Sequence, residues 1–270
     1  MRSPERDEMP AVRPWSGGVF LGSGWLLYSG AVGSASLHRH HAAQVLVARS
    51  GVGEIDDGQA AVCRARAILV AADAPHAMRC ATLSAYLLYL ESGSRIAQRL
   101  EASQGPSLHA LHDGALEDLL SEPEPASLES ARRIALRMVG LLAPAALVGG
   151  ARPRHPSVRR AMALMPALIE QHGNELRLRA VAAAVGRSPE GFSRVFNDEV
   201  GMSVPAYIRW ARLRFVARSL ARGLTLTDAA QDAGFSDSAH LSRVFRDTFG
   251  ARPSDLAACT RWAVGDVELS

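Results

Sequence analysis

One short phrase occurs twice near the end of this 270-residue chain. Ser-Arg-Val-Phe stands at residues 193–196 and again at residues 242–245, and a glycine follows each copy at the same shift of 49 residues, as Gly201 and Gly250. The repeat predicts two similar structural units. A helical solenoid would need roughly three or more such units, and only two are present. Two small units are instead typical of a protein that binds two neighbouring sites on one polymer.

Each copy has the parts of a helix-turn-helix unit. An alanine-rich stretch of helical character comes first, at residues 178–185 and 226–233, and its small side chains allow a second helix to cross closely. A glycine then stands where the turn needs a left-handed backbone, and a good N-cap residue follows it. The glycines are Gly186 and Gly234, and the caps are Ser188 and Asp237.

The helix after each turn is expected to bury one face and to expose the other. Apolar residues recur at the i, i+3, i+4 spacing of a buried face: Phe192, Val195 and Phe196, then Leu241, Val244 and Phe245. The opposite faces carry polar groups of the length that reaches base edges in a major groove. We therefore expect double-stranded DNA as the partner. The candidate contacts are Ser188, Glu190, Ser193, Arg194, Asn197, Asp237, Ser238, Ala239, His240, Ser242, Arg243 and Arg246.

The charge distribution favours the same partner. The chain contains no lysine, so each of its 30 basic side chains is an arginine, whose planar fork matches phosphate and guanine. Residues 154–262 hold sixteen arginines against ten acidic residues, an excess of six positive charges, whereas the rest of the chain has a net charge of −3. A basic C-terminal module behind a mildly acidic N-terminal one is typical of a nucleic-acid binder fused to another domain.

From about residue 158 to 258 the sequence resembles the AraC/XylS family of bacterial transcription regulators. The most specific positions are Ala229, Ala230, Gly234, Phe235, Leu241, Ser242, Arg243, Phe245, Gly250 and Pro253. The resemblance implies two reading helices in successive major grooves, with Arg194 and Arg243 near bases or phosphates and Ser193, Ser238, His240 and Ser242 tuning the sequence read. It also implies a homodimer and contact with RNA polymerase. The first copy departs from the pattern at Pro189, Glu190 and Gly191, so we expect the second copy to read more strongly.

The N-terminal part predicts short strands at residues 19–27, 44–48, 60–64, 67–71 and 85–90, with turns at residues 51–53 and 56–58. Helical periodicity then appears at residues 96–102 and 128–142, and later at 158–172 and 203–222. The expected fold class is α+β. An N-terminal cupin-like β-barrel with helices covers residues 1–142, a proline- and glycine-bearing linker covers residues 143–156, and an all-α double helix-turn-helix domain covers residues 157–262.

A histidine motif in the first half resembles that of cupin barrels: His38, His40 and Gln44, then Gly51, and later Pro75-His76. This resemblance implies inward-pointing imidazoles that could hold nickel or zinc, although Gln44 replaces the glutamate of enzymatic cupins. The alternative is a sensor barrel that keeps the motif for packing and hydrogen bonding, without metal. We expect a small-molecule or metal effector in this domain. The resemblance to the AraC/XylS family also implies pairing through helices of the N-terminal domain, which makes the apolar side of the helix at residues 128–142 a candidate dimer seam.

Other classes are less consistent with the sequence. A cupin enzyme with an incidental helical appendage conflicts with the missing glutamate and with the specificity of the repeats. A methyltransferase fused to the same module would need a cysteine in an active-site context, and Cys63, Cys80 and Cys259 are scattered. These few cysteines, together with the lack of an apolar run of roughly 20 residues, predict a cytoplasmic protein without a membrane partner.

Overall fold

The computed structural model describes residues 15–59, 61–79, 83–91, 94–104, 108–111, 116–142, 144, 154–257 and 261–269. Most of the predicted linker, residues 143–156, lies outside the described residues, as do Cys80 and Cys259. Within these ranges, no helix is both long enough and apolar enough to cross a bilayer.

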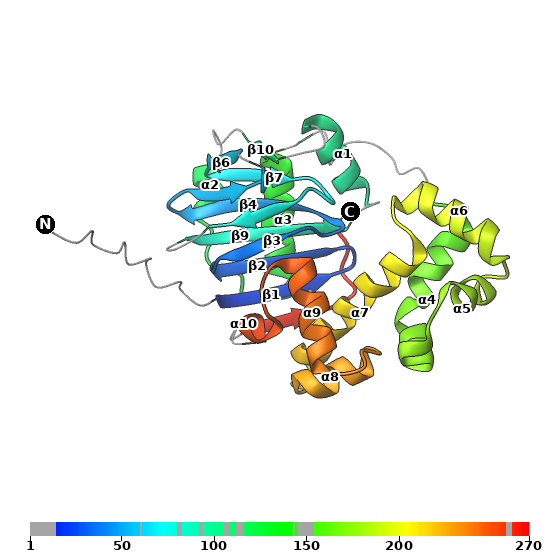
Figure 1. Cartoon of the computed structure of the whole chain (residues 1–270). Helices are drawn as coiled ribbons and strands as arrows, with labels where there is room; N and C mark the ends of the chain where they lie inside the picture. Colours follow the sequence, from blue (N-terminus) through cyan, green and yellow to red (C-terminus); the bar gives the residue numbers. More distant parts are fainter. Residues whose placement is uncertain are drawn as a thin grey trace, which may run out of the picture.

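The N-terminal part contains two β-sheets (Figure 1). A seven-stranded sheet has the order β10-β7-β4-β9-β2-β1-β11, and a four-stranded sheet has the order β3-β8-β5-β6. The strands are β1 Ser16–Gly22, β2 Trp25–Ala31, β3 Ala35–His38, β4 Ala42–Ser50, β5 Gly53–Asp56, β6 Val62–Ala65, β7 Ala67–Val70, β8 His76–Met78, β9 Ser84–Glu91, β10 Leu108–Ala110 and β11 Arg261–Val264. The mixed α+β organisation is confirmed. The predicted barrel is not, because among the strands described no ladder joins the two sheets into a closed ring.

The large sheet is buried on both faces, which explains the nearly continuous apolar runs of its central strands. Along β9, Tyr86 and Leu88 belong to one core cluster, whereas Leu87 and Tyr89 belong to another, since successive side chains point to opposite faces. The first face is covered by α1 (Arg95–Gln104), α2 (Leu116–Leu120) and α3 (Leu128–Leu142) (Figure 1). The second face lies against the small sheet and the C-terminal helices.

Two predictions in this part are wrong. The strand predicted at residues 19–27 is a hairpin, because the chain turns at Ser23 and Gly24 and β2 pairs antiparallel with β1. The apolar side of α3 is not a dimer seam: Ile134, Ala135 and Met138 are buried against the large sheet of the same chain. An amphipathic pattern shows that a helix covers an apolar surface, but it does not show whose surface that is.

The C-terminal helices follow the predicted order. They are α4 Pro156–His172, α5 Leu178–Ala184, α6 Pro189–Val200, α7 Val204–Ala221, α8 Leu226–Asp232, α9 Ser238–Phe249 and α10 Pro253–Ala257, with a short 3₁₀ turn at Gly173–Glu175. Helix α7 joins the two helix-turn-helix units, and its 18 residues span about 27 Å. Figure 1 shows the first unit projecting from the sheets, whereas α9 of the second unit lies over them.

After α10 the chain returns to the N-terminal part. Strand β11 adds to the edge of the large sheet, parallel to β1, with Val19 opposite Trp262. The segment that follows is held there as well, because Trp25 Nε1 donates to the Val267 carbonyl at 2.7 Å and Ser23 N donates to the same oxygen at 2.8 Å. The helical module is therefore tied to the large sheet through its C-terminal extension.

The two turn glycines have the predicted left-handed backbone, with φ of +68° at Gly186 and +76° at Gly234. Their surroundings differ. A Cβ on Gly186 would meet nothing within 4 Å, whereas a Cβ on Gly234 would lie 2.4 Å from the carbonyl carbon of Gly173. The second turn therefore packs directly on the end of α4, in addition to joining α8 to α9.

This difference predicts unequal effects of one substitution. Gly186→Ala should lower the free energy of unfolding by about 1–2 kcal/mol, the cost of an L-residue in the left-handed region. Gly234→Ala should cost clearly more, because the methyl group also forces the turn away from Gly173. Urea denaturation of both variants tests this. Equal losses would show that the second turn does not depend on the contact with α4.

Candidate functional site

Helix α6 is positioned by its cap and its apolar face. The Ser188 hydroxyl accepts a hydrogen bond from the Gly191 amide at 3.2 Å, as predicted for an N-cap. Phe192 and Phe196 are fully buried, and the Phe196 ring lies 5.3 Å from that of Tyr207 on α7. The predicted contact residues are on the other side: Ser188, Glu190, Arg194 and Asn197 are exposed and Ser193 is half-buried.

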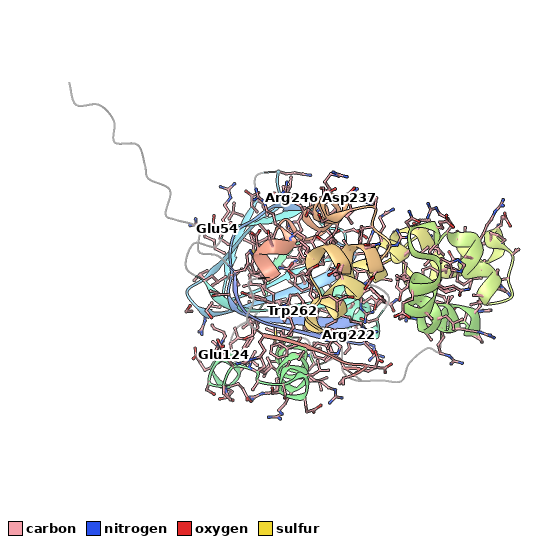
Figure 2. The ribbon with its side chains drawn as sticks, turned by 90° about the horizontal axis from the view of Figure 1, so that it is seen from below. Glu54, Glu124, Arg222, Asp237, Arg246 and Trp262 are labelled. Atoms are coloured by element: carbon pink, nitrogen blue, oxygen red, sulfur yellow. The ribbon has the colours of Figure 1, made fainter. Side chains whose placement is uncertain are left out.

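Helix α9 is built in the same way. Asp237 caps it, because its carboxylate accepts a hydrogen bond from the His240 amide at 2.6 Å, and this bond is the main cause that lowers the pKa of Asp237. Leu241 and Phe245 are buried beneath the helix. Of the predicted contact residues, Asp237, Ala239, Arg243 and Arg246 are exposed, and Ser238, His240 and Ser242 are half-buried. Figure 2 shows Asp237 and Arg246 together on one side of the molecule, opposite Glu124.

Hydrogen bonds divide the polar groups of α9 into two kinds. Ser242 donates to the Ser238 carbonyl at 2.8 Å, and the His240 ring lies 3.1 Å from the Ser236 hydroxyl. These groups are engaged within their own helix end. Arg243 and Arg246, by contrast, form no ion pair with an acidic side chain of the described segments. The two guanidinium groups are therefore the cations that α9 can offer to a polyanion.

A histidine cluster lies in the small sheet and its neighbourhood. His38 on β3 pairs in register with His76 on β8, and His40 follows β3, so that one ring nitrogen of each residue lies within 4.8 Å of the others. His38 and His76 have ring centroids 4.1 Å apart, and those of His40 and His76 are 4.9 Å apart. Gln44 is fully buried beside them, its Oε1 3.0 Å from His40 Nε2. The structure thus brings together the four residues that the sequence motif singled out.

Backbone carbonyls set the tautomers of His38 and His76. Nδ1 donates to the Ser36 carbonyl in His38 (2.7 Å) and to the Ala74 carbonyl in His76 (2.9 Å), which in a neutral ring leaves Nε2 with a lone pair. In His40 both ring nitrogens face an oxygen, Nδ1 the Ala42 carbonyl at 2.8 Å and Nε2 the Gln44 side-chain oxygen at 3.0 Å, and a neutral ring donates to only one of them. Burial lowers the pKa of His38 to about 4 and that of His76 to about 2, and it also lowers the pKa of His40. The rings are therefore neutral near pH 7, as metal ligands must be.

An apolar cavity lies between part of the large sheet and the C-terminal helices that pack on it. It encloses about 820 Å³ of space, including its opening to solvent. One wall is formed by sheet residues that include Val19, Leu87 and Tyr89, and the other by α7 and α9 residues that include Trp210 and Phe249. The four tryptophans of the chain all line it: Trp15, Trp25, Trp210 and Trp262. The closed part of this space is about 60 Å³, below the roughly 300–1,000 Å³ of small-molecule sites, so a ligand has to widen the cavity to enter it.

The cavity holds one buried ion pair. Arg214 on α7 lies 3.2 Å from the carboxylate of Glu91 at the end of β9, and it also donates to the Gly22 carbonyl at 3.0 Å. The side chain of Glu91 is 6% exposed, so its charge depends on this partner. Arg214 therefore joins the helical module to the sheet by charge as well as by packing.

Similarity to known proteins is concentrated in the C-terminal module. A family model described as a helix-turn-helix domain matches residues 181–258. The transcriptional activator NphR of Rhodococcus sp. is 39% identical over 89 residues, which are 32% of this chain and 26% of that protein. The module is an AraC-type helix-turn-helix domain. The predicted resemblance to the AraC/XylS family is thereby confirmed for this part of the chain.

Solved structures extend the likeness of fold to most of the chain. An apo form of ToxT from Vibrio cholerae superimposes with a TM-score of 0.54 at 12% identity, over 88% of this chain and 98% of that one. ToxT bound to an unsaturated fatty acid gives a TM-score of 0.52 at 10% identity, over 88% of this chain and 96% of that one. The two-domain arrangement is thus a known fold. The match with the curated relative NphR, by contrast, spans only about a quarter of the length of that protein.

The cavity residues had no signal in the sequence analysis. Tyr89, Trp210 and Phe249 come from three distant segments, and each reads locally as an ordinary core position. Arg214 was also missed, since an arginine in a long helix is usually a solvated residue. Nothing in the local sequence places the AraC-type domain against the sheet, so only the tertiary structure reveals this site.

The ion pair predicts a strong effect of removing one partner. Arg214→Ala leaves the Glu91 carboxylate buried without a counter-charge and should lower the free energy of unfolding by about 3–5 kcal/mol. The double variant Glu91→Gln with Arg214→Met removes both charges and should recover most of that loss. Urea denaturation of the single and double variants measures both effects. A single variant as stable as the wild type would show that the pair does not hold the domains together.

Proposed function

We propose that this chain is a sequence-specific DNA-binding transcription regulator controlled by an effector in its N-terminal part. The observation that carries the proposal is the pair of N-capped helices, α6 and α9, each of which buries its apolar face and exposes arginine and other polar groups. The two helices follow each other through α7, whose length of about 27 Å approaches the pitch of B-DNA, about 34 Å. A connecting helix of this length supports the proposal that α6 and α9 enter successive major grooves on one side of a duplex.

The second unit is proposed as the stronger reader. It presents Arg243 and Arg246, whereas the first presents Arg194 beside the acidic Glu190. A guanidinium group can bind guanine in a bidentate manner, and a carboxylate in the same groove is repelled by phosphate. NphR, which shares this module, is named a transcriptional activator, and this supports the proposed role in transcription. RNA polymerase and a second copy of the chain are the proposed protein partners.

The proposed effector domain is the cupin-like N-terminal part, and its effector is a largely apolar small molecule. The cavity supports this, because its walls are almost entirely apolar and its one ion pair, Glu91 with Arg214, offers a polar end. The ToxT structure with an unsaturated fatty acid supports the same class of ligand, since that protein shares the fold.

An effector in this cavity would contact both domains at once. It would touch the large sheet on one side and Trp210, Phe245 and Phe249 on the other. A ligand shifts an equilibrium between conformations only by its difference in affinity for them. Occupancy would therefore favour one arrangement of α9 relative to the sheet, and through α9 it would change the affinity for DNA.

Arg243→Ala tests the DNA-reading face. We expect a loss of about 1–3 kcal/mol in binding to a duplex selected by the wild-type protein from random DNA, if Arg243 pairs with a guanine. The matched control is Arg133→Ala, which removes an exposed arginine from α3 on the other side of the sheet and should leave affinity unchanged. Fluorescence anisotropy at several salt concentrations measures both. Unchanged affinity of the Arg243 variant would contradict the role of α9.

The tryptophans report on the cavity directly. Titration with oleate should shift the tryptophan emission in a saturable manner, because all four indoles line the proposed site. Oleyl alcohol serves as the uncharged analogue and tests the role of the polar end. Ala217→Phe should weaken binding by filling the cavity, and Ala221→Phe, on the same helix outside its lining, should not. Emission that responds to neither lipid would exclude an acyl chain as the effector.

A further inference from the structure

The C-terminal end of α9 lies on the histidine cluster. The Ser36 amide donates to the Gly250 carbonyl at 3.0 Å, and the Ser36 hydroxyl donates to the same oxygen at 3.1 Å. Gly250 packs so closely on β3 that an added Cβ would lie 2.5 Å from His38 Nδ1. Phe249 lies beside the cluster, with its ring centroid 6.4 Å from that of His40 and 6.0 Å from that of Tyr89. The second reading helix thus ends at the three imidazoles.

We propose that a transition-metal ion held by His38, His40 and His76, the ligands that the cupin-like motif implies, strengthens the contact between the end of α9 and the small sheet. The metal-binding part of this inference rests on the cluster alone. Its consequence for DNA reading rests on the proposed function, so the tests below are made without DNA.

The ligand set fits a late first-row metal. His38 and His76 each donate Nδ1–H to a backbone carbonyl, which is the outer contact that metal-bound histidines commonly make. His40 Nδ1 lies 2.8 Å from the Ala42 carbonyl, so this ring makes the same contact when its Nε2 turns from Gln44 to the ion. His76 Nε2 is buried and has no hydrogen-bond partner, so a lone pair there is unsatisfied without an ion. Three neutral imidazoles favour zinc, nickel, cobalt or copper over magnesium or calcium, which prefer oxygen ligands.

Binding requires a small contraction of the cluster. Zinc–nitrogen bonds of about 2.0–2.1 Å place tetrahedral ligand atoms roughly 3.3 Å apart. One ring nitrogen of each histidine lies within 4.8 Å of those of the other two, so small rotations of the rings bring them into range. His40 Nε2 exchanges its contact with Gln44 Oε1 for the ion. The ring of His38 is the one that links the ion to α9, because its Nδ1 is bonded to the Ser36 carbonyl while the other polar groups of Ser36 hold Gly250.

Ser36 contacts both His38 and Gly250, and it therefore couples an ion on His38 to the end of α9. An ion on His38 fixes the ring and, through its bond to the Ser36 carbonyl, the strand that holds Gly250. The ion should therefore bind more tightly when α9 is in place than when α9 has moved away. Thermodynamic linkage is reciprocal, so a substitution that weakens the α9 contact must lower the affinity for the metal by the same factor. This reciprocity distinguishes a coupled site from a metal site that happens to be nearby.

The first experiment measures binding. Purified full-length protein is stripped with a chelator and titrated with Zn²⁺ by calorimetry, and with Co²⁺ by its visible absorption as a spectroscopic probe. The wild type should bind about one ion per chain with histidine-only ligation. His76→Ala and His40→Ala should lose this binding, whereas His109→Ala, a half-buried histidine on β10 outside the cluster, should keep it. No binding by wild-type protein that is folded by circular dichroism overturns the proposal.

The second experiment measures the coupling. Phe249→Leu, and as a stronger change Phe249→Ala, reduces the contact of α9 with His40 and Tyr89 while all three histidine ligands are retained. Zn²⁺ affinity should fall roughly fivefold or more. Val244→Ala truncates a half-buried residue of the same helix away from the cluster and should leave the affinity unchanged.

Hydrogen exchange gives the complementary readout. Zn²⁺ should slow amide exchange in β3 and at the end of α9 in the wild type, and it should not do so in His76→Ala. If both Phe249 variants bind Zn²⁺ as tightly as the wild type, the site is uncoupled and the proposed link to α9 is wrong. Loss of metal binding would leave the test of Arg243 on DNA unaffected, so failure here and failure of the proposed function can be told apart.

Discussion

The packing of the AraC-type domain on one face of the large sheet is the interaction on which the rest of the structure depends. A sheet whose strands are apolar on both faces must cover both. Helices α1 to α3 cover one face, and the small sheet and the C-terminal helices cover the other. The AraC-type domain therefore completes the core of the N-terminal part. Any ligand that enters between the sheet and the C-terminal helices must displace or reshape core contacts. Its binding therefore changes the contacts that hold α9 in place.

Helix α7 packs against three partners, the large sheet and the two helix-turn-helix units. Tyr207 packs against Phe196 of the first helix-turn-helix unit, Trp210 and Arg214 face the sheet, and Leu213 and Val216 belong to the core of the second unit. A helix with one partner would show one apolar stripe. In α7 buried side chains are distributed around the helix, and Arg212 is buried as well, with a hydrogen bond to the Gly173 carbonyl at 2.7 Å. Helix α7 thus contacts the sheet and both helix-turn-helix units at once.

The sequence was most informative where local chemistry decides the structure. The caps at Ser188 and Asp237 and the left-handed turns at Gly186 and Gly234 are confirmed, because each depends on a residue's own hydrogen bonds or backbone freedom. The histidine cluster was predicted from the resemblance of its motif to that of cupin barrels, and the register of β3 and β8 brings His38 and His76 together. The binding of DNA by α9 and of metal by these histidines are predictions.

Long-range pairing could not be predicted in the same way. Strand β11 follows the helical module in the chain, and nothing near Trp262 shows that it pairs with β1, far away in sequence. The same holds for α3, whose apolar face is satisfied within the chain. Both results have one physical origin. The periodicity of apolar residues indicates that one face of a helix or strand is covered, while the topology of the fold determines which segment covers it. The cavity and the contact of α9 with the histidines lie where two such surfaces meet. A residue there contacts partners from both domains, so its role can be inferred only after the domains have been placed together.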